Sequence, residues 1–126
     1  MASEHGPKRL AIARIWRGRT RRNIADEYER YNFEEGIRPL IEKASAVQTF
    51  RDDRDTETEF MTISYWESLD MMTAFAGSDP TAIHHLPRDA EYLIELPTHV
   101  QIVELRVDSR RTQTPCGSLS AASDHR

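Results

Sequence analysis

The chain has 126 residues, of which 38% are apolar, and a formal net charge of −4. This length suits a single domain, and the charge argues against nucleic-acid binding, which usually needs a strongly basic face. No apolar run approaches the ~20 residues of a membrane span, and residues 1–9 lack an apolar stretch of signal-peptide length. We therefore expect a cytoplasmic protein with neither a membrane nor a nucleic-acid partner.

The two ends of the chain differ in composition from the middle. Residues 1–8 are polar and contain Gly6 and Pro7, which predicts a flexible N-terminal arm. Residues 108–126 are rich in Ser, Thr, Gly and Pro and bury too little apolar surface to hold an ordered structure, which predicts a disordered C-terminal tail. A single folded domain is expected over residues 9–107, where nearly all of the apolar side chains lie.

The first element expected in chain order is a strand over residues 9–16. Ile12 and Trp16 alternate there with Ile15, which places apolar side chains on both faces of the strand. Gly18 is expected to end it.

A helix is expected next. Thr20 is a candidate N-cap, because its hydroxyl can accept a hydrogen bond from a backbone N–H of the first turn. Apolar side chains at helical spacing then form one face of this helix: Ile24, Tyr28 and Tyr31. Gly36 and Pro39 predict that the helix stops near Glu35.

Two strands follow, over residues 45–51 and 59–66, separated by the charged turn 52–56. The second strand is the strongest strand prediction in the chain, because it is rich in aromatic and β-branched residues. The short connection predicts an antiparallel hairpin. Alternation along the second strand divides its apolar residues between two faces, with Phe60 and Trp66 on one and Met61, Ile63 and Tyr65 on the other.

Helix signals return after the hairpin. Ser68 is the expected N-cap of a second helix, which Gly77 closes. An acceptor followed by proline, Asp79-Pro80, then predicts the start of another helical piece. This piece would carry the adjacent histidines, His84 and His85.

A short helix over residues 89–96 and a last strand over residues 99–107 complete the expected elements. Their order is β-α-β-β-α-β, the split β-α-β or ferredoxin-like arrangement of α+β proteins. In such a fold, helices cover one face of a four-stranded antiparallel sheet.

The expected sheet is apolar on both faces, whereas the expected helices suffice for one. A second sheet, supplied by a two-fold partner, is the simplest cover for the remaining face. We therefore expect a homodimer in which two sheets close a dimeric α+β barrel.

Four stretches carry a family resemblance: residues 13–20, 25–28, 59–69 and 74–77. Together they resemble the antibiotic biosynthesis monooxygenase-like superfamily over about residues 9–107. The resemblance implies an ABM domain with the dimeric α+β barrel fold. Some members of that superfamily oxidise polycyclic aromatic substrates with O₂ and no cofactor, and others degrade haem.

The haem-degrading branch is expected to carry an Asn on the first strand, a Trp in the helix after the third strand, and a His about ten residues further on. This chain has Ile15 or Trp16 in place of the Asn and Phe75 in place of the Trp. Only the histidine, as His84 or His85, matches. Haem degradation is therefore a minor alternative, and no cofactor is expected.

His84 and His85 are candidate catalytic bases, because imidazole exchanges protons near neutral pH. Adjacent side chains on a helix diverge by ~100°, so at most one of the two would face a pocket. The alternative is a pair at a helix end, with one ring capping carbonyl groups and the other in solvent. The only cysteine, Cys116, lies in the polar tail, and no metal site is predicted.

One arginine and a set of aromatic residues are candidates for substrate binding. Arg14 lies in mid-strand, where a charge is costly unless it is paired. It could bind an acidic group of a substrate or form a salt bridge with Glu104. The aromatic candidates could wall a pocket or belong to the core: Trp16, Tyr65, Trp66 and Phe75.

The leading functional hypothesis is an oxidoreductase, a cofactor-independent monooxygenase acting on a small aromatic or polyketide-like substrate. The reaction class comes from the family resemblance. In this chemistry a phenol-type substrate loses a proton to a base in an apolar pocket, and the resulting anion reduces O₂. The alternative, from a different class, is a non-catalytic small-ligand-binding or stress-response barrel with the same dimeric fold.

Overall fold

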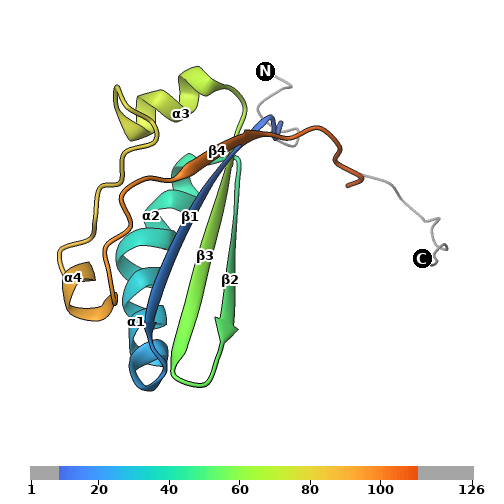
Figure 1. Cartoon of the computed structure of the whole chain (residues 1–126). Coiled ribbons are helices and arrows are strands. Elements are labelled where there is room, and N and C mark those ends of the chain that lie inside the picture. The colour runs from blue at the N-terminus through green and yellow to red at the C-terminus, as the bar shows by residue number, and fades with distance from the viewer. Residues whose placement is uncertain (1–8, 111–126) are drawn as a thin grey trace, which may run out of the picture.

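The computed structural model describes residues 9–110, which form one antiparallel sheet with helices on one side (Figure 1). The strands are β1 (Ile12–Arg21), β2 (Ala46–Asp53), β3 (Glu57–Trp66) and β4 (Gln101–Glu104), in the spatial order β2-β3-β1-β4. The expected four-stranded, ferredoxin-like α+β fold is confirmed. The predicted arm, 1–8, and most of the predicted tail, 108–126, lie outside the described residues.

One long helical run and two shorter helices form the helix layer. The long run consists of the 3₁₀ turn η2 (Arg22–Ile24), α1 (Ala25–Asn32), the π-helical turn η3 (Phe33–Ile37) and α2 (Arg38–Lys43). The helices α3 (Leu69–Ala76) and α4 (Asp89–Tyr92) follow β3 and are joined by residues 77–88, here called the connecting segment. No helix within residues 9–110 is long and apolar enough to cross a membrane.

The first strand is longer than predicted, because Gly18 does not end it. Gly18 pairs with Phe60 in the ladder between β1 and β3. A Cβ atom at this position would lie 2.5 Å from the ring of Trp16, so the glycine allows that ring to lie against the strand. Thr20 is therefore a buried strand residue and not a helix cap, and its hydroxyl donates to the carbonyl of Arg21 at 2.9 Å.

The first helix also runs further than predicted. Gly36 lies inside the π-helical turn, and Pro39 lies in the first turn of α2, where the N–H that proline lacks is not needed. A Cβ atom on Gly36 would lie 3.2 Å from both the Asn32 and Leu86 side chains. The glycine therefore allows the connecting segment to approach the helix closely.

The hairpin and the caps of α3 form as predicted. β2 and β3 pair antiparallel, from Ala46 opposite Tyr65 to Asp53 opposite Thr58. The Ser68 hydroxyl accepts a hydrogen bond from a backbone N–H of the first turn at 3.1 Å, and Gly77 ends the helix with a positive φ of 98°.

The helical piece predicted after Asp79 and Pro80 is not formed, so His84 and His85 lie on an irregular segment. Ala82 forms a β-bridge with His99, and the Val100 N–H donates to the Thr81 carbonyl. These bonds tie the connecting segment to the chain that leads into β4. The predicted helix over 89–96 is reduced to α4, and the last strand is shorter than the predicted 99–107.

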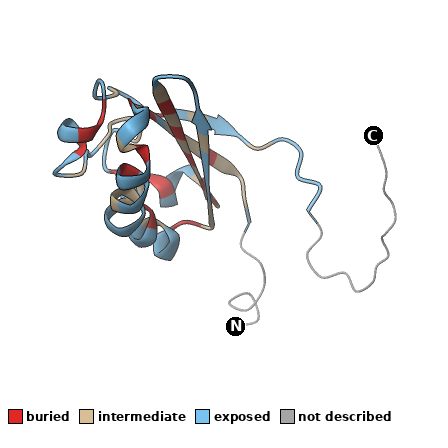
Figure 2. Ribbon diagram, turned by 90° about the horizontal axis from the view of Figure 1, so that it is seen from below, coloured by how far each residue is buried: buried red, intermediate tan, exposed pale blue. Residues whose placement is uncertain are grey.

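The core lies between the helices and the sheet (Figure 2). One cluster gathers around Tyr28, with Phe60, Tyr92 and Leu93, and the other joins Trp66 to Met72 and Ala44. Along β3, every second residue is buried against the helices, and the residues between them are half-buried on the other face. The predicted division of β3 into two apolar faces is confirmed.

Candidate functional site

Two hollows lie between the helix layer and the sheet. The inner pocket, about 260 Å³, is lined mainly by residues of β1, β3, the π-helical turn and the connecting segment, and it opens to solvent. The edge groove, about 520 Å³, runs between α1 and the edge strand β2. Asn32, Ile37 and Thr62 line both hollows, so the two adjoin.

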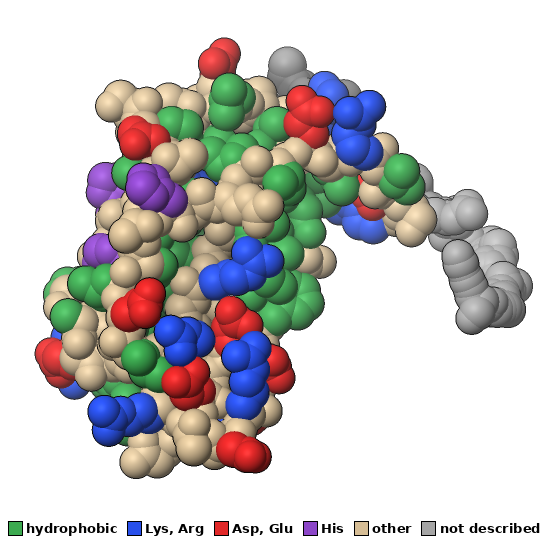
Figure 3. All heavy atoms as spheres, viewed as in Figure 1, with side chains coloured by type: hydrophobic (Ala, Val, Ile, Leu, Met, Phe, Trp, Pro, Cys, Tyr) green, Lys and Arg blue, Asp and Glu red, His purple; other side chains and the backbone are tan. Residues whose placement is uncertain are grey.

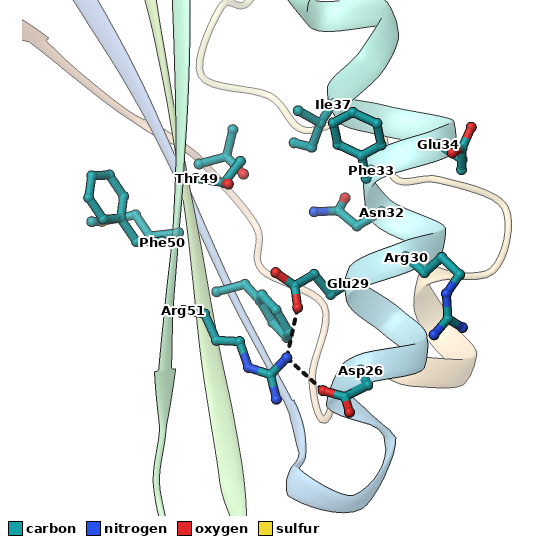
Figure 4. A pocket seen from close by; sticks show the side chains of 13 residues that line it. Asp26, Glu29, Arg30, Asn32, Phe33, Glu34, Ile37, Thr49, Phe50 and Arg51 are labelled. Carbon is teal, nitrogen blue, oxygen red and sulfur yellow. Dashed lines mark hydrogen bonds and ion pairs between the residues drawn. The ribbon is translucent and has the colours of Figure 1, made fainter.

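In the edge groove, Arg51 is held by several carboxylates. It reaches from β2 to Asp26 and Glu29 on α1 at 2.8 and 2.7 Å (Figure 4), and it binds Asp53 at 2.8 Å. The hydrogen bond with Asp53, followed by that with Asp26, raises the pKa of Arg51. The same contact with Arg51 lowers the pKa of Asp53. These contacts join α1 to the sheet edge, which is a structural role.

The inner pocket combines apolar walls with a small number of polar groups. Trp16 on β1 and Phe75 on α3 supply aromatic rings, and aliphatic side chains come from Ile37, Leu40, Ile83 and Leu86. The ionisable groups in the wall are Arg14, Glu35, His84 and Asp89. This combination is typical of small-molecule sites, and we take the inner pocket as the candidate functional site.

Four of the predicted site residues line this pocket: Arg14, Trp16, Phe75 and His84. Trp66 lies behind the wall as a core residue, stacked on Phe75 with ring centroids 5.0 Å apart. Its indole N–H donates to the Ser64 hydroxyl at 3.0 Å. Tyr65 lies on the opposite face of the sheet, where its hydroxyl donates to the Gln48 side chain at 2.9 Å.

The two histidines have different surroundings. His84 Nε2 lies 3.1 Å from the carbonyl oxygen of Ala76 at the end of α3. Because a carbonyl only accepts hydrogen bonds, Nε2 is the donor, which leaves Nδ1 able to accept a proton. His85 is not among the pocket-lining residues, and its Nδ1 lies 4.0 Å from the Asp89 carboxylate. The structure therefore brings only His84 to the pocket.

Arg14 is held by backbone carbonyl groups. Its Nε donates to the Pro80 carbonyl at 3.0 Å and its Nη2 to the Ala82 carbonyl at 2.8 Å. The alternative salt bridge with Glu104 is not formed, since Ile102 lies opposite Arg14 and Glu104 pairs with Arg106. Burial lowers the pKa of Arg14.

The sequence reasoning missed five polar residues that line the pocket: Asn32, Glu35, Thr62, Ser64 and Asp89. Asn32 lies four residues after Tyr28, on the same face of α1, and this spacing could have found it. Asp89 is buried, and its carboxylate accepts hydrogen bonds from the Tyr28 hydroxyl at 3.1 Å and the Leu86 N–H at 3.0 Å. No sequence signal marks Asp89, because an acidic residue at a helix start is commonly exposed. Within the described part of the chain, no group of three or more His, Cys, Asp or Glu residues could hold a metal ion.

Comparison with known proteins gives a similarity in fold. No family model matches the sequence, and no curated protein matches it. The structure is similar to the crystal structure of a Bacillus cereus protein provisionally assigned as an antibiotic biosynthesis monooxygenase. The TM-score is 0.57, and the match covers 82% of this chain and 100% of the other at 10% identity. The resemblance that the sequence suggested is thus confirmed at the level of the fold.

Proposed function

We propose that the inner pocket binds a small aromatic or polyketide-like molecule and oxidises it with O₂, without a cofactor. The observation that carries this proposal is the convergence of His84 with the rings of Trp16 and Phe75 on one pocket of about 260 Å³. Such walls suit a flat apolar molecule, and the imidazole supplies an acid–base group. The shared fold with the Bacillus cereus protein supports the reaction class.

His84 would act as the general base. The hydrogen bond from its Nε2 to Ala76 fixes the ring so that Nδ1 can take a proton from a phenol or from the acidic CH₂ group of an anthrone. The resulting phenolate or carbanion is electron-rich and reduces O₂ directly. In the anthrone case the CH₂ carbon becomes a carbonyl: one oxygen atom forms the new C=O bond, and the other leaves as water with the two hydrogens. The substrate supplies all of the electrons.

The sheet face opposite the pocket supports a homodimer. Apolar side chains there include Ile15, Met61 and Ile63, with Phe50 and Val103 more exposed at 46% and 37%. The described helices lie on the other side of the sheet (Figure 1). A contiguous apolar face of this kind marks an association surface, and a two-fold partner with the same face covers it most simply.

Oxygen uptake tests the proposed reaction. With model anthrones and quinols, the full chain should consume O₂ and convert the substrate. Replacement of the base, His84→Ala, should lower the rate about 10²–10⁴-fold, the usual contribution of a general base. The neighbouring change His85→Ala is the matched control and should leave the rate nearly unchanged, because His85 is not among the pocket-lining residues.

No O₂-dependent conversion, or an equal loss in both histidine variants, would contradict the proposal. Native mass spectrometry against a metabolite extract then addresses the alternative, because a small molecule retained without conversion favours a non-catalytic binding barrel. Titration with haem tests the minor alternative, haem degradation. If the Soret band does not shift, the chain does not bind haem and this alternative is excluded.

A further inference from the structure

Arg14 brings a half-buried positive charge to the inner pocket, and no carboxylate of the described residues neutralises it. Two of its N–H groups are used by the carbonyls of Pro80 and Ala82. No carboxylate oxygen within residues 9–110 lies within 4.0 Å of its guanidinium. A guanidinium has more donors than these two bonds use, so Arg14 retains hydrogen-bonding capacity in the pocket wall.

The acidic residues of the pocket do not fill this role. Asp89 accepts hydrogen bonds from Tyr28 and Leu86. Glu35 lines the pocket but is exposed, and among the described residues no ion pair joins it to Arg14. Elsewhere in the structure, Arg51 shows the usual arrangement for a partly buried arginine, with carboxylates on several sides. Arg14, which is also half-buried, has no such carboxylate within residues 9–110, and removing a charge from water without an opposite charge is costly.

The geometry points to a ligand with an ionised carboxylate, which Arg14 binds while the ligand's ring lies against Trp16 and Phe75. This inference rests on the proposed function, since it names the substrate class of the same pocket. Among side chains, the planar guanidinium of arginine has the geometry that fits a carboxylate best, because it can donate two parallel charge-assisted hydrogen bonds to the two carboxylate oxygens. Arg14 is then a specificity-determining residue, and its two carbonyl contacts hold the guanidinium in place.

A pair of ligands that differ only in charge tests this inference. We would titrate the full chain with 2-naphthoate and with 2-naphthamide at pH 8, where an ordinary imidazole is neutral, and follow tryptophan fluorescence. The wild-type chain should bind the naphthoate at least about tenfold more tightly, as expected for charge-assisted hydrogen bonds. Arg14→Gln should remove this preference and leave the affinity for the amide nearly unchanged.

Arg17→Gln is the matched control, because Arg17 lies on the same strand but on the opposite face, where it contacts Gln101. It should keep the full preference for the naphthoate. If Arg14→Gln does not fold, Arg14→Lys decides, because a lysine keeps the charge and should retain part of the preference.

Several results would overturn the inference: naphthoate binding no tighter than the amide or not at all, equal effects of the two glutamine variants, or no preference in a folded Arg14→Lys chain. Parallel loss of both ligands in Arg14→Gln would assign Arg14 a purely structural role in holding the connecting segment. The proposed oxidation and the role of Arg14 can be contradicted independently of each other. A chain without O₂ uptake that still prefers naphthoate contradicts only the reaction, and an active enzyme without the preference contradicts only the role of Arg14.

Discussion

The two faces of the sheet differ in cover and in chemistry, although they share the same strands. Toward the helices, β3 presents an unbroken series of buried residues: Thr58, Phe60, Thr62, Ser64 and Trp66. Toward the other side it presents Met61, Ile63 and Tyr65, which are only half-buried. The covered face contains small polar residues, of which Thr62 and Ser64 line the inner pocket, and the uncovered face is apolar along part of its length. A period of two along one strand thus separates side chains that line the inner pocket from apolar side chains on the uncovered face.

The uncovered face is itself divided along its length. In one half, Ile15 lies opposite Ile63, and Ala13 lies between Tyr65 and Val103. In the half near the β2–β3 turn, arginines of β1 lie opposite glutamates of β3: Arg19 with Glu59 and Arg21 with Glu57. In Figure 3, which has the view of Figure 1, side chains of both charges gather over the lower part of the molecule. We expect a second copy to contact the apolar half.

A charge in the apolar half should have the largest effect. Wild-type chain at micromolar concentration should give a light-scattering mass close to twice the 14.6 kDa chain mass. Ile63→Asp should reduce this to the mass of a single chain, because burying an unpaired carboxylate in an apolar contact is costly and the two-fold axis introduces it twice.

The matched control is Ile41→Asp, which introduces the same charge at a 50% exposed position on α2, away from the uncovered face. This variant should remain dimeric. A wild-type chain that is already monomeric, with cooperative melting that does not depend on concentration, would show that the apolar face is left uncovered.

The exclusion of water from the covered face should be detectable in the pH dependence of the free energy of unfolding. Tyr28 is fully buried, and burial, followed by the charge of Asp89, raises its pKa far above the usual value of about 10. Above about pH 10, the Tyr28 hydroxyl loses its proton in the unfolded chain and keeps it in the folded chain. The free energy of unfolding therefore contains the full contribution of the Tyr28 hydroxyl below about pH 10. Above about pH 10 this contribution decreases by about 1.4 kcal/mol per pH unit.

Urea unfolding between pH 9 and about 11.5 measures this slope. Tyr28→Phe has no proton to keep and should show a flatter slope by that amount. Asp89→Asn should keep most of the slope, because burial is the first cause of the raised pKa. Equal slopes in the wild-type and Tyr28→Phe chains would mean that solvent reaches the Tyr28 hydroxyl in the folded state.

The sequence predicted those parts of the fold that depend on local rules. Alternation along β3 and the caps at Ser68 and Gly77 depend only on neighbouring residues, and all were confirmed. Gly18 and Pro39 were misinterpreted as element ends because their roles depend on other parts of the structure. Gly18 accommodates the Trp16 ring, and Pro39 follows a π-helical turn that the usual helix period does not predict.

The same distinction holds for the pocket. The conformation of the connecting segment depends on bonds to Arg14, which is 66 residues from Pro80, and no local pattern could show this. The position of Tyr65 was available from the sequence, since alternation had already grouped it with Met61 and Ile63 and apart from Trp66. The strand period predicted the face on which Tyr65 lies, whereas residue type alone grouped Tyr65 with the neighbouring Trp66.

The smallest effect is expected in the charged half of the uncovered face. Arg19 donates to Glu57 at 2.7 Å and lies 3.4 Å from Glu95, and the Arg19 and Glu57 side chains are each 35% exposed. Ion pairs this close to solvent contribute about 0–1 kcal/mol. Arg19→Gln should therefore change the free energy of unfolding by less than about 1 kcal/mol, as measured by urea unfolding, and added salt should reduce the difference further.

The same variant also locates the association surface. If the second copy contacts only the apolar half, Arg19→Gln chains should still scatter light as dimers, in contrast to Ile63→Asp. Dissociation of Arg19→Gln would instead mean that the Arg19–Glu57 pair is desolvated between two copies, where loss of one partner leaves a buried charge unpaired and costs several kcal/mol. Comparison with Glu57→Gln and the double variant would then measure the coupling across this pair, which is near zero for an exposed pair and large for a buried one.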